Sequence, residues 1–263
     1  MTVHTFVVLA YNDSQFLEDC IQSLNRQTVP STILLSTSTP SASIDRIAAK
    51  YALPVAINRG EKGIAADWNF GLSQAKTSFV TLAHQDDIYL PEFTQKTLQV
   101  AQQRSDNLIT FCDYAEQRGE IVTSATTNLR IKRFLVKLAF WQDSYVRTPF
   151  LKRLLLSFGS PIPCPAVTYN INNLTNFQFS SSFSINMDWD AWIRIAARSG
   201  SIGHVPEVLQ VHRIHTESET TSGIADNRRA KEDREMFKRL WPAPIAGALT
   251  RVYALSYRAN KAD

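Results

Sequence analysis

The sequence predicts an α/β protein with a mainly parallel sheet that helices flank on both faces. Short apolar runs rich in β-branched residues alternate with longer segments in which apolar residues recur at helical spacing. The alternation repeats without interruption through the first 114 residues. A helix between successive strands is the connection that parallel strands need, and a sheet built in this way is covered on both faces.

The first unit has a strand and then a helix. The run TFVVLAY (5–11) is apolar and β-branched, and Asp13 or Ser14 can cap the helix that follows it. The apolar residues of that helix recur at helical spacing: Phe16, Leu17, Ile21 and Leu24. By the same patterns, we expect further strands at 31–36, 53–58, 78–84 and 107–114, and further helices at 43–52, 63–75 and 91–104.

The regular alternation ends near Tyr114. Beyond it we expect a basic amphipathic stretch, a helix, a strand and two helical segments, at 129–141, 189–199, 208–213, 226–240 and 245–260. The chain contains no internal repeat and no Gly/Ser-rich linker. We therefore expect one main domain over 1–218, with halves at 1–114 and 115–218, and a C-terminal helical extension at 219–263 that packs on it.

The composition indicates a soluble globular protein. A chain of 263 residues with 44% hydrophobic content can bury a sizeable core. The net charge is only +4, so nucleic acid is not an expected partner; the basic segments 130–137 and 227–239 are either solvated helix faces or patches for a membrane surface or an anionic substrate. Cys20, Cys112 and Cys164 form no CxxC pattern, which predicts neither a zinc site nor disulfides and fits a reducing cytoplasm. Neither a signal sequence nor a membrane span is expected.

Two adjacent carboxylates, Asp86 and Asp87, follow an apolar strand in LAHQDDIYLPEF. Ligands of such sheets bind beyond the carboxyl ends of the strands, where AYND, STSTPS and HQDD are all expected to lie. Two like charges side by side repel each other unless a cation or hydrogen-bond donors neutralise them. A divalent ion held by one or two carboxylates and completed by substrate phosphate oxygens would do this. The alternative is that one aspartate caps the helix expected from Pro91 while the other lies in water.

Four segments, taken in order, resemble the family-2 glycosyltransferases, a large inverting family with a GT-A fold. They are VVLAYNDSQFLEDCIQSLNRQT, NRGEKGIAADWNFGLSQAKTSFVTLAHQDDIYLPEF, INMDWDAWIRIAARSG and VLQVHRIHTES. The resemblance extends over residues 5–218. It implies a GT-A fold, a divalent metal (Mn²⁺ or Mg²⁺), a nucleotide diphosphate-sugar donor bound by the half at 1–114, and an acceptor bound by the half at 115–218.

The resemblance also implies roles for individual residues. Asp87 would ligate the metal that bridges the diphosphate, and His215 would add a ligand. His84 stands where the commoner DxDD form has its first aspartate, and we interpret it as a tolerated variant because the metal-bound position is the last one. His212 is interpreted as a strand residue that faces another element. The donor would be contacted by Ala10, Tyr11, Asn12, Ser36, Arg59, Gly63, Asn69, Asp86 and Arg213.

The second carboxylate segment is MDWDAWIRIA, which resembles the EDWDLWLRL of the family with Met187 in place of glutamate. Asp188 falls on the position of the catalytic base. An acceptor hydroxyl is a poor nucleophile until a base takes its proton, and a carboxylate within hydrogen-bond reach can do this. Apolar neighbours such as Trp192 would raise its pKa. The alternative is that Asp188 caps the helix that begins here, while Asp190 lies on an exposed or supporting face.

The resemblance thus implies a metal-dependent, inverting glycosyltransferase that moves a sugar to a hydroxyl of a glycan or lipid-linked glycan, in cell-surface polysaccharide synthesis. The uncharged region 160–186 either lines an acceptor groove or covers the sheet as a structural loop. The mildly basic segment 244–261 either packs on the domain or rests on a membrane. We expect a cytoplasmic enzyme, with peripheral contact at the inner face of the membrane as the open alternative.

Two departures from the family pattern leave the donor sugar and the nucleotide base open. Hydroxyl residues at 36–39 stand where relatives that read uridine often carry an aspartate, and Trp68 stands where many relatives carry arginine. A non-catalytic glycan- or nucleotide-binding subunit with a degenerate site is therefore an alternative. A sugar-nucleotide nucleotidyltransferase is less favoured, because AYNDSQF has neither the glycine nor the basic residue that a triphosphate loop needs.

Overall fold

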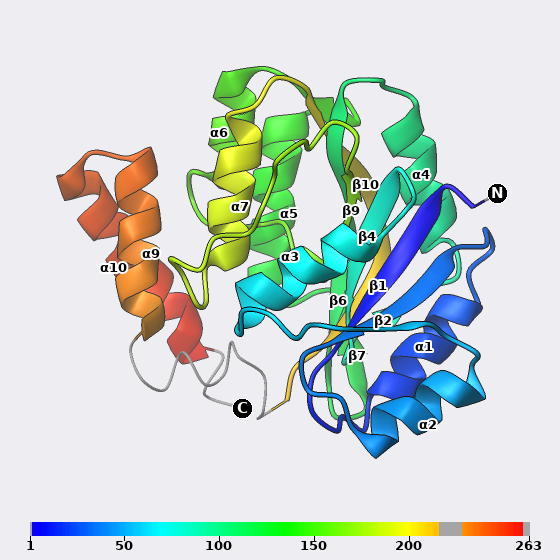
Figure 1. The fold of residues 1–263 in the computed structure, drawn as a ribbon. Coiled ribbons are helices and arrows are strands. Elements are labelled where there is room, and N and C mark those ends of the chain that lie inside the picture. Colours follow the sequence, from blue (N-terminus) through cyan, green and yellow to red (C-terminus); the bar gives the residue numbers. More distant parts are fainter. Residues whose placement is uncertain (1, 216–227, 260–263) are drawn as a thin grey trace.

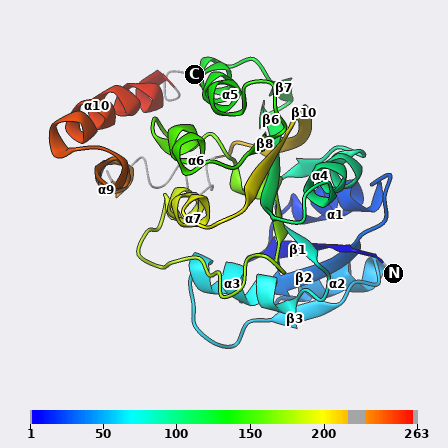
Figure 2. The ribbon, with the colours of Figure 1, turned by 90° about the horizontal axis from the view of Figure 1, so that it is seen from above.

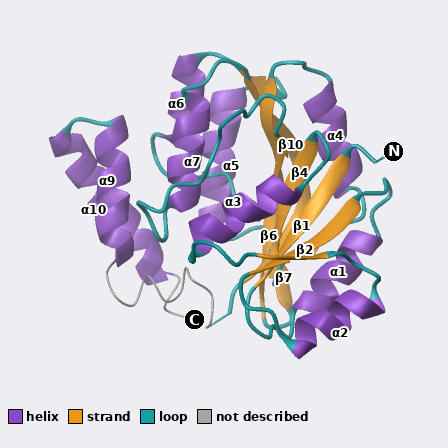
Figure 3. Cartoon of the chain, in the orientation of Figure 1, coloured by secondary structure: helices purple, strands orange, loops and turns teal. Residues whose placement is uncertain are grey.

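A computed structural model of the protein describes residues 2–215 and 228–259. Ten strands in this part of the chain form one sheet, and helices cover both of its faces (Figure 1, Figure 3). The strands are β1 (His4–Ala10), β2 (Thr32–Thr37), β3 (Val55–Ile57), β4 (Phe79–His84), β5 (Ile88–Tyr89), β6 (Asn107–Arg118), β7 (Ile121–Thr123), β8 (Tyr145–Val146), β9 (Val167–Asn170) and β10 (Ser201–Arg213). The helices are α1 (Leu17–Asn25), α2 (Ala42–Lys50), α3 (Ile64–Gln74), α4 (Phe93–Gln102), α5 (Thr127–Phe140), α6 (Pro149–Leu156), α7 (Met187–Ala196), α9 (Arg228–Leu240) and α10 (Ala243–Ala259), with a 3₁₀ turn at Cys164–Ala166.

The strand order is β3-β2-β1-β4-β9-β6-β10-β5, with β7 paired to β6 and β8 paired to β10. Strands β1 to β4 run parallel. Strand β9 is antiparallel to both β4 and β6, so β6 and its parallel neighbour β10 share the direction of β1 to β4. The sheet is therefore mixed, with six strands in one direction, which confirms the mainly parallel α/β class.

The centre of the sheet differs from the sequence expectation. The uncharged region 160–186 contributes β9, which lies between the two halves of the sheet. Thr168 of this strand pairs with Thr81 on one side and Thr110 on the other, and all four residues of β9 are buried. A four-residue strand with a proline-rich approach carries little periodic signal, and its pairing depends on strands far away in sequence. The short strands β5, β7 and β8 and the helix α6 were not predicted either.

Two layers of helices enclose the sheet, as the view from above shows (Figure 2). Along β1, Phe6 and Val8 face the cluster that includes residues of α1, α2 and α4, whereas Val7 between them faces the cluster that includes residues of α3, α5, α6 and α7. This alternation is the two-residue period of a strand whose two faces are both buried. The core therefore lies on both sides of the strands, and their carboxyl ends are left for a site.

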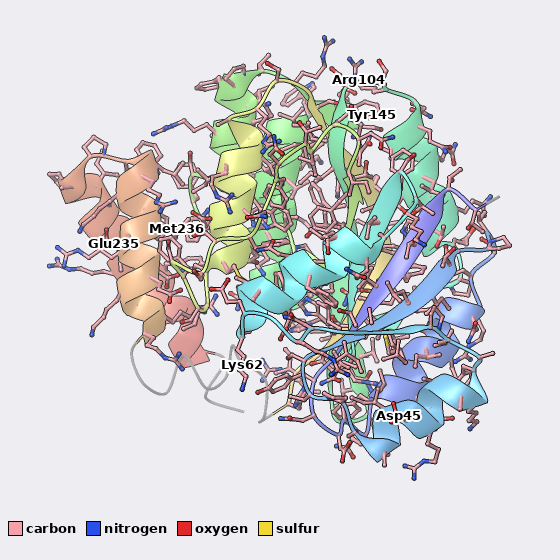
Figure 4. All side chains as sticks on the ribbon, viewed as in Figure 1. Asp45, Lys62, Arg104, Tyr145, Glu235 and Met236 are labelled. Atoms are coloured by element: carbon pink, nitrogen blue, oxygen red, sulfur yellow. The ribbon has the colours of Figure 1, made fainter. Side chains whose placement is uncertain are left out.

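Helices α9 and α10 lie against α7, on the side away from the sheet (Figure 1, Figure 2). Phe237 of α9 packs edge-on against Trp189 of α7, with ring centroids 5.1 Å apart, and Tyr253 of α10 contacts both rings. Met236 is fully buried and points toward α7, whereas Glu235 points away from it (Figure 4). The expected start of this helix, residues 226–227, lies outside the described residues. None of the helices that the structure describes is both long and apolar enough to cross a membrane.

Candidate active site

The candidate site lies at the carboxyl ends of β1, β4, β6 and β10, which meet at one edge of the sheet. Leu9 near the end of β1 pairs with His84 at the end of β4, and Arg213 at the end of β10 pairs with Gln117 of β6. The acid pair follows β4 directly. The topology thus brings residues around 10, 85 and 213 together, at the edge where sheets of this type bind ligands.

Asp87 is fully buried and held from one side. Its Oδ1 accepts hydrogen bonds from Nδ1 of His212 at 3.0 Å and from the backbone N–H of Arg213 at 3.1 Å. Its Oδ2 is also buried, but has no hydrogen-bond partner among the residues that the structure describes. Burial lowers the pKa of His212, yet the charge and hydrogen bond of Asp87 raise it more, so the net shift is upward. Strand β10 therefore holds the Asp87 carboxylate through Oδ1, and Oδ2 has no partner among the described residues.

Asp86 has a different set of neighbours. Its Oδ2 lies 2.9 Å from Nε2 of His215, and the His215 ring packs against Phe16 at 5.2 Å. Burial would raise the pKa of Asp86, but the neighbouring histidines, His84 foremost, hold it below its ordinary value. Asp86 is thus a carboxylate at neutral pH that three imidazoles surround.

The guanidinium of Arg213 is engaged within the protein. Its Nη2 donates to Oδ2 of Asp19 at 2.9 Å, and the group lies over the Phe16 ring at 4.9 Å. Neither aspartate of the pair caps the following helix: the N-cap of α4 is Glu92, without a side-chain cap bond. The capping alternative for the acid pair is therefore wrong.

Gln85, which no sequence motif singled out, holds the loop after β1 in place. Gln85 accepts the backbone N–H of Tyr11 and donates to its carbonyl, each at 2.9 Å. Asn12 has a positive φ of 53°, and its N–H donates to Oγ1 of Thr39. Tyr11 is left exposed and Ala10 is buried at the end of β1. The first loop, the end of β2 and the HQDD segment are therefore one hydrogen-bonded unit.

A second clamp joins the other two donor-side loops. Asp67 of α3 accepts the Ser38 hydroxyl at 2.7 Å and the Asn58 amide at 2.8 Å. Ser36 is buried in β2, and its hydroxyl lies toward Gly71 of α3. Gly63 begins α3 with a φ of +116°, a conformation that favours glycine, and a Cβ there would meet only open space. The loop before α3, with the exposed Arg59, thus has an accessible glycine turn next to the edge of the sheet.

The α3 residues predicted near the donor are used differently. The Asn69 amide makes two hydrogen bonds, to the carbonyl and the N–H of Phe179 at 2.9 and 2.7 Å. Trp68 packs against His84 at 5.1 Å and against Phe179 at 4.9 Å. Asn69 therefore holds the segment after β9 onto α3, and an aromatic ring covers the imidazole of His84.

Asp188 lies in the first turn of α7 and is half-buried. The N-cap of α7 is Asn186, and Oδ1 of Asp188 accepts the N–H of the next residue, Trp189, at 2.6 Å. Burial raises the pKa of Asp188 to about 6, although this N–H and the charges of Arg229 and Lys132 act in the opposite direction. A carboxylate with such a pKa is ionised at pH 7 and can still take a proton, which is what a general base requires. Asp190 is not exposed: it is buried and pairs with Arg194 and Arg239.

Asp188 and Asp87 act electrostatically on a common neighbour. Burial raises the pKa of the Cys164 thiol, and the charges of Asp188 and Asp87 both raise it further. The Lys132 ammonium likewise acts on both Asp188 and His212. Both carboxylate sites therefore influence the buried Cys164 thiol.

Residues 5–155 match the family model described as glycosyl transferase family 2. The chain belongs to this family. Its sequence is 28% identical over 139 residues to EpsJ, an uncharacterized glycosyltransferase of Bacillus subtilis (strain 168), a match that covers 51% of this chain and 40% of EpsJ. The chain thus spans less than half the length of that relative.

Two solved structures have a similar fold. S. aureus TarS 1-349 in complex with UDP-GlcNAc matches 90% of this chain and 65% of its own, with a TM-score of 0.64 and 15% identity. The mannosyltransferase PcManGT from Pyrobaculum calidifontis, in complex with GDP-Man and Mn²⁺, matches 99% and 76%, with a TM-score of 0.60 and 16% identity. These findings confirm the predicted family and its GT-A fold.

The residues of this family member fit a divalent ion. One ligand atom each from His84, Asp86 and Asp87 lie within 4.8 Å of one another. The unpartnered Oδ2 of Asp87 supplies a buried anionic oxygen, which is the donor type that Mg²⁺ and Mn²⁺ bind. Asp87 and Asp86 are therefore suited to hold the ion. His215 lies next to Asp86, bonded to it, so its predicted role as a ligand remains a prediction.

Sequence reasoning missed a residue that positions the helix of Asp188. Both oxygens of Glu232 in α9 accept backbone N–H groups, from Ser184 and Ile185 at 2.9 Å and from Asn186 at 2.8 Å. A carboxylate that accepts several N–H groups at a helix N-terminus is well stabilised there. No motif marks Glu232, which is one acid in a highly charged helix. Residues 216–218, the end of the segment VLQVHRIHTES, lie outside the described residues.

Proposed function

We propose that this protein is a metal-dependent, inverting glycosyltransferase. It transfers a sugar from a nucleotide diphosphate-sugar to a hydroxyl of a glycan or a lipid-linked glycan. The observation that carries the proposal is a pair of carboxylate sites, at Asp87 and Asp188, that both act on the buried Cys164 thiol. Asp87 keeps a buried, unpartnered oxygen among the described residues, and Asp188 has a pKa of about 6. The first suits a cation and the second suits a general base.

In the proposed reaction, Asp188 takes the proton of the acceptor hydroxyl. The acceptor oxygen forms a bond to the anomeric carbon from the face opposite the diphosphate, and the bond from that carbon to the diphosphate oxygen breaks. The nucleoside diphosphate leaves, and the configuration at the anomeric carbon is inverted. A divalent ion at Asp87 and Asp86 would stabilise the negative charge that the departing diphosphate gains.

The donor is proposed to lie across the clamped loops. Backbone and side chains of Ala10, Tyr11 and Asn12, with Arg59 and Gly63, border the edge of the sheet beside the acid pair. Ser36, Asn69 and Arg213 are already bonded or buried within the protein, so we propose that they support donor binding by holding these loops.

The role in cell-surface polysaccharide synthesis is part of this proposal. EpsJ, the similar Bacillus protein, is a glycosyltransferase by name, and TarS and PcManGT were crystallised with nucleotide sugars. We propose that the cytoplasmic protein works at the inner face of the membrane if its acceptor is lipid-linked. Division into a main domain at 1–218 and an extension at 219–263 is likewise proposed, supported by the contacts of α9 and α10 with α7.

The experiment is a hydrolysis screen of nucleotide sugars with Mn²⁺ or Mg²⁺, which needs no acceptor. The active donor is then used to compare wild type with Asp87→Asn and Asp188→Asn. Both variants should lose at least about 100-fold in turnover, the usual contribution of a positioned acid or base. Full turnover by both variants would reject the assigned roles.

A non-catalytic nucleotide-binding subunit is the second candidate. It is favoured by Trp68, which stands where many relatives carry arginine and instead packs on His84. Thermal-shift titration with UDP and GDP distinguishes the candidates when it is combined with the hydrolysis screen. Metal-dependent stabilisation without any hydrolysis would favour the binding subunit.

A further inference from the structure

We propose that His84 is a nitrogen ligand of the metal ion and that it makes the site prefer Mn²⁺ over Mg²⁺. The inference rests on the proposed function, since it concerns the ion that Asp86 and Asp87 would hold. It changes the interpretation of His84 from a tolerated replacement of an aspartate to a residue that selects the metal.

Unpartnered polar atoms lie among the side chains of this cluster. Nε2 of His84 and Oδ2 of Asp87 are both buried, and neither has a hydrogen-bond partner among the residues described. Leaving such an atom unsatisfied is unfavourable. The two atoms belong to residues whose ligand atoms, together with one of Asp86, lie within 4.8 Å of one another. Two metal bonds of about 2.1–2.3 Å reach across about 4.2–4.6 Å at most, so a small movement of the side chains toward one another would let one ion satisfy the cluster.

The side chains of the cluster are also held in place by their neighbours. Asp87 is oriented through its other oxygen by His212 and the backbone of Arg213. The ring of His84 is covered by Trp68, with centroids 5.1 Å apart. Outer partners that orient the ligands are typical of metal sites in proteins. Trp68 would thus keep the imidazole directed at the ion, which accounts for an aromatic residue at a position where many relatives have arginine.

The chemistry of the donor set then gives the preference. Mg²⁺ takes oxygen ligands almost exclusively, in a strict octahedron. Imidazole nitrogen binds the later divalent metals more strongly, and Mn²⁺ accepts mixed nitrogen and oxygen sets. Replacing one carboxylate by histidine therefore weakens Mg²⁺ relative to Mn²⁺.

The test measures metal binding directly. The loss of the free Mn²⁺ signal in electron paramagnetic resonance gives its Kd, and competition gives the Kd of Mg²⁺, with metal alone and with added UDP or GDP. In His84→Ala we expect Mn²⁺ binding to weaken about 10- to 100-fold, with the Mg²⁺ Kd changed much less. In His84→Asp the ratio of the two Kd values should move toward Mg²⁺.

A matched control is His204→Asn. His204 pairs with Asp113 at 3.0 Å and lies outside the cluster, so its loss should leave the metal preference unchanged. An unaltered Mn²⁺ Kd in His84→Ala, with binding lost in Asp87→Asn, would overturn the role of His84 and leave the proposed function intact. Mn²⁺ binding that survives in Asp87→Asn would instead contradict the metal site itself.

A separate observation carries a second proposal. We infer that the exposed face of α5 rests on an anionic lipid surface. Three apolar side chains of α5 at a spacing of three and four residues fall on this face, and all are exposed: Ile131 by 52%, Phe134 by 64% and Leu138 by 42%. Trp141, which ends the helix with a φ of 55°, is exposed by 77%. Such a stripe on a helix surface is unusual unless something covers it.

The charges of α5 favour a lipid surface as the occupant. The helix, Thr127–Phe140, contains four basic residues and no acidic one. Lys132 and Arg133 bond to Tyr114 and Asp113, whereas Arg130 and Lys137 are exposed and fall seven residues apart along the apolar stripe. An apolar stripe with aromatic residues and basic side chains beside it is typical of helices that lie in a membrane interface.

Vesicle flotation tests this proposal. Wild type should float with vesicles of phosphatidylcholine and phosphatidylglycerol, and much less with phosphatidylcholine alone. Phe134→Asp should abolish flotation. Val252→Asp is the matched control, because Val252 is 66% exposed on α10, the segment that the sequence offered as a membrane surface.

Loss of flotation in Val252→Asp alone would assign the membrane contact to α10 and overturn the role of α5. No flotation of the wild type, or dimers that Phe134→Asp dissociates without lipid, would also overturn it. In the latter case a second copy of the chain would be the occupant.

Discussion

Replacing Asp188 by asparagine should abolish sugar transfer and yet stabilise the folded protein at neutral pH. Burial raises the pKa of this carboxyl from 3.8 to about 6, so keeping it ionised in the folded state is unfavourable. Asparagine has nearly the same shape and carries no charge. Its side-chain oxygen can still accept the N–H of Trp189. The substitution therefore removes the buried charge and retains the local hydrogen bond.

The size and sign of the effect follow from the pKa. A shift of about two units corresponds to about 3 kcal/mol. Because the folded-state pKa lies above the unfolded one, the folded state binds more protons between pH 4 and 6, and the wild type loses stability as the pH rises through this window. The variant lacks this loss. Its advantage in the free energy of unfolding should be about 3 kcal/mol at pH 7 and only about 1 kcal/mol at pH 4.5.

Urea unfolding followed by tryptophan fluorescence at both pH values measures this difference. Asp190→Asn is the control, since it removes the partner of Arg194 and Arg239 in the same helix and should destabilise the protein. If Asp188→Asn is less stable than wild type at pH 7, the carboxylate is stabilised by its surroundings. Asp188 would then not have the raised pKa that the role of general base requires.

Three further predictions concern the same region. With Asp188 as base, kcat/KM should fall about tenfold per pH unit below pH 6 and level off above it, as a pH profile would reveal; a flat profile contradicts the assignment. Glu232→Gln should lower the free energy of unfolding by about 1.5–3 kcal/mol, and the fold-change in kcat should exceed that in the donor KM. The exposed Glu235→Gln should change neither stability nor kcat. Equal effects of the two substitutions would refute the positioning role of Glu232. Gln85→Ala should raise the donor KM by releasing the backbone of Tyr11, with little change in thermal stability; initial-rate kinetics decide, and an unchanged KM counts against the clamp.

The alternation of strands and helices predicted the fold of the first 114 residues because each of those elements has a strong period of its own. What the sequence did not indicate is how the sheet continues. Strand β9 is held by pairing with β4 and β6, not by its own composition, and β10 begins at Ser201 rather than near 208. Elements that depend on distant partners leave little local signal.

The site residues also divide into those with a local sequence signal and those that depend on distant partners. The motifs indicated the carboxylates, because acids after an apolar strand or at the start of a helix are conspicuous in a sequence. They did not indicate which neighbours orient them. His212 was interpreted as facing another element, and the structure shows it bonded to Asp87 from 125 residues away. Gln85 and Glu232 act through backbone groups, so residue type alone gives no reason to single them out.

The placement of these partners shows why the donor half is not a site by itself. Family similarity covers residues 5–155, which include the acid pair. The groups that fix the pair, His212, the Arg213 backbone and His215, all come from the end of β10, and Asp188 comes from α7. Without β10 the fully buried Asp87 would have lost both donors to its Oδ1, and two adjacent like charges would repel. The segment that carries the motif therefore depends on the later half of the chain for the hydrogen-bond donors that hold Asp87 in place.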